Sequence, residues 1–150
     1  MYFSSKKGFS LLEMLLSIAI ISLIGGLSLP IYYSFQARND LDLATDVITQ
    51  VVRRAEILSR TMTYDDGWGV YITSGTATLF KGSDYTSRDT SYDEISSIAP
   101  SVQISGGAVE ITFIKMTGNP ISAPITITLN STSANNISII TINEKGTISF

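Results

Sequence analysis

Hydrophobic and polar positions change their pattern twice along this chain. From Met14 to Ala37 no residue is charged, and leucine and isoleucine dominate the first part of the stretch. These 24 residues exceed the number, roughly 20, that cross the core of a bilayer as a helix. The pattern therefore predicts a transmembrane helix within residues 9–37.

Beyond Pro30 the pattern becomes amphipathic. Apolar residues recur at steps of three and four, and charged residues stand between them. The apolar positions are Ala44, Val47, Ile48, Val51, Ala55, Leu58 and Met62. We expect one helix from Phe9 to about Met62, whose second half turns one apolar stripe toward a core.

The remaining residues alternate in the manner of β-strands. Residues 68–72 and 76–80 flank Thr73, Ser74 and Gly75, which predicts a hairpin. Further strands are expected at 101–104, 108–116, 125–129, 137–142 and 147–150, with turns at Gly106-Gly107, Asn119-Pro120 and Lys145-Gly146. A long helix followed by antiparallel strands predicts an α+β fold in which residues 38–150 form an amphipathic helix and a head built on a β-sheet.

The segment from Lys81 to Ser97 breaks the alternation. It is rich in serine, threonine, aspartate and tyrosine, and this composition predicts a long exposed loop. Its four carboxylates offer oxygen ligands of the kind that calcium prefers. The spacing of an EF-hand is absent, so a solvated acidic loop is the simpler interpretation, and we expect no metal or other cofactor.

Composition narrows the possible chemistry. The chain contains neither cysteine nor histidine, which excludes disulfides and thiolate chemistry and removes the commonest general base. Past Phe35 there are twelve acidic and eight basic residues. An acidic head is a poor surface for phosphates, so nucleic-acid binding through Arg53, Arg54 and Arg60 is the less favoured interpretation of those residues.

The direction of the apolar helix follows from the residues around it. Lys6 and Lys7 precede the run and no comparable basic cluster closely follows it, which places the N-terminus in the cytoplasm and the head outside. A secretory signal peptide cut near residues 25–30 is the competing interpretation. Its apolar core would be shorter, and no amphipathic helix would be expected to continue it.

Glu13 is the exceptional residue of this segment. A carboxylate deep in hydrocarbon costs about 2.5–3.5 kcal/mol on insertion scales, and such residues are usually paired and functional. Alternatively, Glu13 lies shallow enough to reach the lipid headgroups. Position alone does not decide between the two.

The string KKGFSLLEM, residues 6–14, resembles the processing site of type IV pilins and type II secretion pseudopilins. In that family a basic leader ends in glycine, the next residue is typically phenylalanine, and a glutamate stands at the fifth mature position. Gly8, Phe9 and Glu13 match these positions, and Pro30 matches a frequent helix-breaking proline. RRAEILSRT, WGVYI and INEKGTIS are similar to stretches of the GspH- and FimT-like pseudopilin subgroup.

The resemblance implies a sequence of events. A prepilin peptidase would remove residues 1–8 by cutting after Gly8, and the new terminus at Phe9 would be N-methylated. The Glu13 carboxylate would pair with the amine of a neighbouring subunit, and the helix would loosen at Gly25, Gly26 and Pro30. The subunit would cross the inner membrane once and then enter an extracytoplasmic filament, with sibling pilins, a platform protein and an assembly ATPase as partners.

Other functions remain as alternatives at this point. A membrane-anchored adhesion or DNA-uptake pilin would differ only in what its head contacts, through residues 81–97 for an adhesin or through the three arginines for DNA. Trp68 is expected to be a packing residue, with a binding role as the alternative. A membrane-anchored enzyme is less favoured, because the sequence contains no nucleophile elbow, phosphate-binding loop or dinucleotide fingerprint. We expect no catalytic residues.

Overall fold

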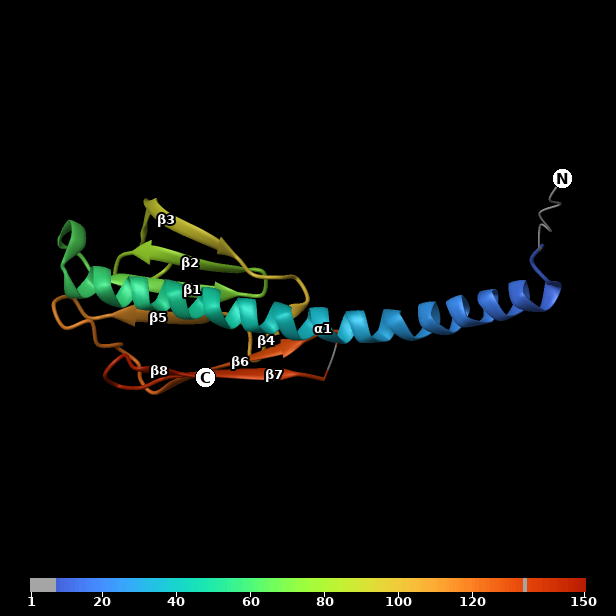
Figure 1. Cartoon of the computed structure of the whole chain (residues 1–150). Helices are drawn as coiled ribbons and strands as arrows, with labels where there is room; N and C mark the ends of the chain where they lie inside the picture. The colour runs from blue at the N-terminus through green and yellow to red at the C-terminus, as the bar shows by residue number, and fades with distance from the viewer. Residues whose placement is uncertain (1–7, 134) are drawn as a thin grey trace. The chain divides into compact units, whose positions relative to one another are not determined.

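The computed structural model describes residues 8–133 and 135–150, without the side chains of residues 27–31. The expected α+β fold is confirmed: one long helix and a short 3₁₀ helix precede antiparallel strands (Figure 1). The elements are α1 (Leu11–Arg60), η1 (Thr63–Asp65), β1 (Trp68–Thr73), β2 (Thr76–Lys81), β3 (Asp89–Ser97), β4 (Val102–Ile104), β5 (Val109–Phe113), β6 (Ile125–Ser131), β7 (Ile137–Ile142) and β8 (Ile148–Ser149).

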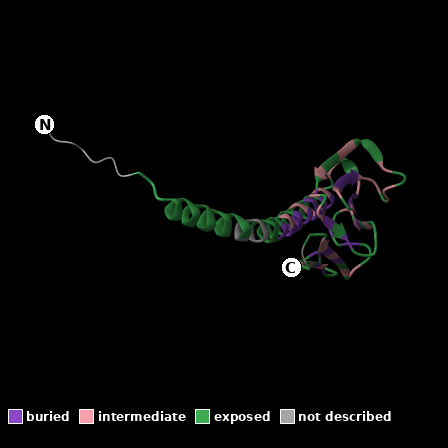
Figure 2. Ribbon diagram, turned by 90° about the vertical axis from the view of Figure 1, so that its right-hand side faces the viewer, coloured by how far each residue is buried: buried purple, intermediate pink, exposed green. Residues whose placement is uncertain are grey.

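The chain divides into two compact units, residues 1–35 and residues 36–150. In the first unit, every residue from Gly8 to Gly26 is exposed (Figure 2). The backbone of α1 is helical through Gly25, Gly26 and Pro30. Because the Pro30 side chain lies outside the described set, the helix break at this stretch stays a prediction.

Hydropathy gives a separate result for membrane crossing. Among the residues that the structure describes, no helix combines the length and the apolar character that a bilayer span requires.

The second unit is built on the C-terminal half of α1. The helix residues that enter its core follow steps of three and four: Leu41, Ala44, Ile48, Val51, Val52 and Ala55. They form one cluster with apolar residues of both sheets, so the helix and the two sheets share a single core. This spacing is the amphipathic stripe that the sequence predicted, except that Met62 was wrongly included: α1 ends at Arg60, and Met62 lies beyond it and is exposed.

The expected antiparallel β head is confirmed, and its strands form two four-stranded sheets. The first has the order β3-β2-β1-β5, and the second has the order β4-β6-β7-β8. All the strand pairs are antiparallel. The sequence did not indicate the division into two sheets, because β4 and β5 follow each other along the chain but belong to different sheets, a choice that local alternation does not encode.

The first hairpin is confirmed. β1 and β2 pair from Trp68 opposite Lys81 to Thr73 opposite Thr76, which leaves Ser74 and Gly75 as a two-residue loop. Gly75 has a φ of 110°, which glycine adopts at little cost. This glycine therefore fixes where the two strands reverse.

The long loop predicted over residues 81–97 is wrong for its second half. Residues 89–97 form β3, which pairs with β2 and is the edge strand of its sheet. Edge strands carry charged residues because these discourage pairing with another chain. β3 contains Asp89, Asp93 and Glu94. Because its sequence is polar, apolar alternation did not predict it as a strand.

The first half of that segment, residues 82–88, is anchored over the outer face of the same sheet. The Tyr85 ring stacks on Tyr71 with centroids 3.9 Å apart, and its backbone N–H donates to Glu110 at 2.9 Å. Hydrogen bonds from Ser87 and Thr86 hold the pKa of the Asp84 carboxyl well below its usual range. The connection is thus exposed but held by many contacts.

Gly69 is the position in β1 where a larger residue does not fit. A β-carbon added there would lie 2.4 Å from the Phe80 ring and 2.9 Å from the Ile111 carbonyl oxygen. Phe80 is fully buried and Ile111 O belongs to the neighbouring strand, so neither has room to retreat. The absence of a side chain at Gly69 is what lets the Phe80 ring lie across β1.

Gly69→Ala is expected to destabilise the second unit by about 1–3 kcal/mol, since overpacking a dense core forces backbone and rotamer shifts. Urea unfolding of the full chain in detergent, followed by the fluorescence of Trp68, measures this change. Gly26→Ala is the matched control, because nothing lies within 4 Å of the β-carbon it adds. Equal midpoints for the two variants would contradict this account of Gly69.

Candidate processing and assembly site

The predicted cleavage site lies just before the first helix. Gly8 and Phe9 precede α1 and are exposed, and 73% of the Phe9 surface is accessible. Nothing lies within 4 Å of a β-carbon built on Gly8. A protease would therefore meet an exposed and unobstructed backbone here, while Lys6 and Lys7 lie outside the described residues.

Ser10 caps the first turn of α1, a role that the sequence analysis missed. Its hydroxyl oxygen accepts the N–H of Glu13 at 3.2 Å, and its carbonyl oxygen accepts the N–H of Met14 at 3.2 Å. Helices begin with backbone N–H groups that have no partner within the helix, and a serine at this position satisfies one of them. The signal was present in the sequence, because S-L-L-E fits the S-x-x-E pattern of a capping box.

Glu13 stands in the first turn of the helix that Ser10 begins. The positive end of the helix dipole favours a carboxylate at this position, typically by 0.3–1 kcal/mol. Phe9 lies before the helix, so helical spacing does not place its backbone nitrogen beside Glu13 in the uncleaved chain. Within one chain, the helix dipole thus stabilises the Glu13 carboxylate only modestly. A cationic group from another chain would stabilise it more.

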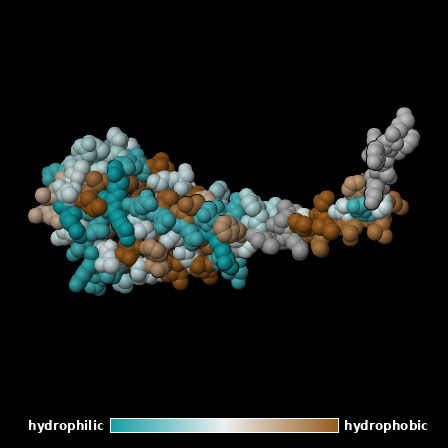
Figure 3. Space-filling model, viewed as in Figure 1, coloured by the Kyte–Doolittle hydropathy of each residue, from teal (hydrophilic) through white to brown (hydrophobic). Residues whose placement is uncertain are grey.

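Apolar side chains surround α1 on all sides in this segment. Eleven large apolar residues between Phe9 and Ile24 are 49–81% exposed, and Figure 3 shows hydrophobic surface over this segment. Burying one such side chain fully stabilises a structure by about 1.5–3 kcal/mol. A helix that is apolar all round requires an apolar environment or close-packed neighbours.

Ser17, a small polar residue in this stretch, is satisfied locally. The Ser17 hydroxyl donates to the carbonyl of Glu13 at 2.7 Å. A serine that bonds to the carbonyl four residues earlier leaves no free donor, which makes it compatible with apolar surroundings.

The three arginines considered for a nucleic-acid surface do not form one open patch. Arg54 donates to Glu94 of β3 at 2.7 Å, and Arg60 pairs with Glu56 one turn earlier in α1. The hydrogen bond and charge of Glu94 raise the pKa of the Arg54 guanidinium. Two of the three cations are thus directly countered by carboxylates.

The four carboxylates considered for calcium are likewise separated. Asp93 pairs with Arg88 at 2.9 Å, Glu94 pairs with Arg54, and Asp84 accepts from Thr86 and Ser87. The described residues contain no group of three or more carboxylates that could hold a metal ion.

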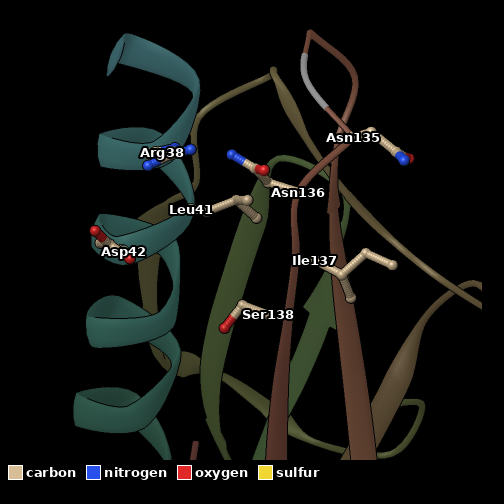
Figure 4. Close-up of a pocket in the computed structure, with 7 residues that line it drawn as sticks. All are labelled: Arg38, Leu41, Asp42, Asn135, Asn136, Ile137 and Ser138. Atoms are coloured by element: carbon tan, nitrogen blue, oxygen red, sulfur yellow. The ribbon is translucent and has the colours of Figure 1, made fainter. Parts of the chain in front are cut away.

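An open cavity of about 480 Å³ lies between α1 and the start of β7 (Figure 4). Arg38 and Asn136 point toward one another across it, whereas Asn135 and Ile137 point away from the helix. At its inner end Ser138 Oγ lies 2.9 Å from Thr45 Oγ1 of α1. Arg38 is the first charged residue after the apolar run, which makes this cavity the part of the head closest in sequence to that run.

Comparison with known proteins gives one finding for the N-terminal segment. The family model of the prokaryotic N-terminal methylation motif matches residues 3–29. The match includes Gly8, Phe9 and Glu13, and it is consistent with a type IV pilin or pseudopilin. No solved structure matches this chain.

Ser10→Ala is expected to fray the first turn of α1. Loss of an N-cap hydroxyl costs about 0.5–2 kcal/mol, so the Glu13 amide should exchange with solvent roughly 2- to 30-fold faster. Hydrogen exchange measured by NMR in detergent micelles tests this expectation. Ser10→Thr should keep the slow exchange, and Ser17→Ala serves as the matched control; unchanged exchange in Ser10→Ala would refute the cap.

Proposed function

We propose that this chain is a structural subunit, a pseudopilin or minor pilin, of a type IV pilus or type II secretion-like filament. The methylation motif over residues 3–29 supports a pilin-type protein, a class that is typically structural and not enzymatic. The head supports the proposal as a compact unit with its own core, suited to remain exposed on a filament.

Before assembly, the subunit crosses the inner membrane once through residues 9–37, with its N-terminus in the cytoplasm. The exposed apolar surface from Phe9 to Ile24 supports this stage, because lipid tails would cover it. The leader of residues 1–8 stays on the cytoplasmic side, where a prepilin peptidase cuts after Gly8.

In the filament, the same surface is covered by the helices of neighbouring subunits. Cutting after Gly8 creates a cationic amine at Phe9, and the Glu13 carboxylate of one subunit pairs with the amine of another. Each charge offsets the desolvation cost of the other, whereas an unpaired charge among apolar helices is costly. The position of Phe9 before the helix supports an intersubunit pair, since its amine is not fixed against Glu13 of its own chain.

The partners follow from this cycle. They are the prepilin peptidase, sibling pilins, an inner-membrane platform protein and an assembly ATPase that acts from the cytoplasm. The observation on which the proposal rests is the conjunction of an exposed Gly8-Phe9 bond, a carboxylate in the first helical turn and a helix with apolar residues on every side.

Gly8→Val is expected to block processing, because a branched side chain at the residue before the cut obstructs the protease. Intact mass and N-terminal sequencing of protein isolated from membranes should give a chain starting at N-methylated Phe9 for wild type, and a chain retaining the leader for the variant. Gly26→Ala, in the same segment, should be processed normally. A wild-type chain that begins at Met1, or beyond Pro30, would contradict the proposal.

Glu13→Gln is expected to be cut normally but to enter filaments poorly. Removing one partner of a buried ion pair costs about 3–5 kcal/mol, so incorporation beside wild type should fall roughly a hundredfold or more. Quantitative mass spectrometry of purified filaments from cells that express both chains measures the ratio. Ser17→Ala is the control, and equal incorporation of Glu13→Gln would reject the intersubunit pair.

A further inference from the structure

A second cavity, of about 360 Å³, lies in the head where the end of α1 meets the first strands. Arg54 and Leu58 of α1, Tyr64 of η1, Trp68 of β1 and Tyr92 and Glu94 of β3 contribute to its lining. Its volume lies within the range of small-molecule sites, about 300–1,000 Å³. The cavity joins two features that the sequence singled out separately, Trp68 and residues 81–97.

The connection beside this cavity has an unusual backbone. Met62, Tyr64 and Asp65 have φ values of 53°, 57° and 58°, in the left-handed region that residues other than glycine rarely adopt. Strained residues persist only where their surroundings fix them, and they gather at binding and catalytic sites. Here the Trp68 indole N–H donates to Thr63 O at 3.1 Å, and the Lys115 amine donates to Asp65 O at 2.9 Å.

This backbone holds an aromatic ring at the rim of the cavity. Tyr64 is 63% exposed although its ring contacts Tyr92, with centroids 4.7 Å apart. Tyr92 in turn forms a T-shaped contact with the buried Trp68, with centroids 6.2 Å apart. The exposed Tyr64 ring therefore forms an aromatic platform, which the Tyr92 ring, tilted by 50° to it, and the buried Trp68 support from within the head.

The charges around the platform are compensated within the head. Arg54 pairs with Glu94, and Asp93 pairs with Arg88. Lys81 Nζ lies 4.6 Å from the Tyr92 ring centroid, a cation–π contact. A charged ligand would have to disrupt these pairs, whereas a neutral ligand could use their polar atoms as hydrogen-bond donors and acceptors.

We infer that this cavity binds a neutral sugar ring of an oligosaccharide. A pyranose has an apolar face of C–H groups, which matches the tyrosine platform, and a rim of hydroxyls, which matches the surrounding carboxylates, guanidinium and backbone groups. The strained turn serves to present Tyr64 to this ring. Such glycan binding goes beyond the proposed filament role and would give the exposed head a ligand of its own.

The test is a titration of the purified full chain with neutral tetrasaccharides of glucose (α-linked and β-linked) and of N-acetylglucosamine, in a detergent without a sugar headgroup. Trp68 is the only tryptophan of the chain, so its fluorescence reports on this cavity. We expect a saturable change with at least one of these sugars. Because the ligand is neutral, its affinity should be the same in about 0.05 M and 0.5 M salt.

Tyr64→Gly is the decisive variant. It removes the ring and relieves the left-handed strain, so the fold should be kept while affinity falls about tenfold or more. Tyr64→Phe should retain most of the affinity. Phe150→Ala is the matched control, since Phe150 is an exposed aromatic residue that does not line the cavity, and it should bind as wild type does.

Three results would overturn the inference: no saturable change with any of the sugars, affinity that falls with salt, or unchanged sugar affinity in Tyr64→Gly. If Tyr64→Gly instead keeps sugar binding and loses entry into filaments, this surface is a contact between subunits. The titration uses unassembled protein, so a negative result leaves cleavage after Gly8 and filament entry untouched.

Discussion

The apolar surface of α1 between Phe9 and Ile24 is the constraint on which both proposed stages of this protein, in the membrane and in the filament, depend. Its side chains point in every direction, so no single packed face within the chain can cover them. Lipid and a bundle of like helices are two environments that satisfy the same surface equally well, because lipid tails are as apolar as leucine. In the proposed assembly, transfer from one to the other would therefore cost little apolar free energy, and the Glu13 carboxylate would set the position of each subunit.

The head has the opposite requirement, because it must bury its apolar residues in a core of its own. In the head, the apolar surface of α1 is limited to one stripe, with Ile48, Val52 and Ala55 at its centre. This stripe packs into a core that it shares with the two sheets. Gly69 and Phe80 show how tightly the first sheet is packed. A rigid head can present a small surface feature, such as the Tyr64 ring, with a defined geometry.

Much of this architecture could be predicted from periodicity and turn residues. The long helix, the Ser74-Gly75 hairpin and most strands follow local patterns, and Gly8, Phe9 and Glu13 follow a motif. β3 was not predicted because an edge strand needs little apolar alternation. The second sheet was not predicted because β4 pairs with β6, a non-local choice. The turn at Tyr64 could not be foreseen, since glycine, asparagine and aspartate are the residues that favour left-handed positions, and Met62 and Tyr64 are none of these.

The acidic edge of the first sheet has a consequence for crowding. Subunits stacked in a regular polymer hold their heads at very high local concentration, where an uncovered strand edge can recruit a second edge and propagate into an irregular aggregate. On β3, Asp89 is exposed and forms no ion pair among the described residues, so two such edges brought together would set like charges near one another. In the proposed filament, β3 would therefore act as a barrier to fusion between neighbouring heads.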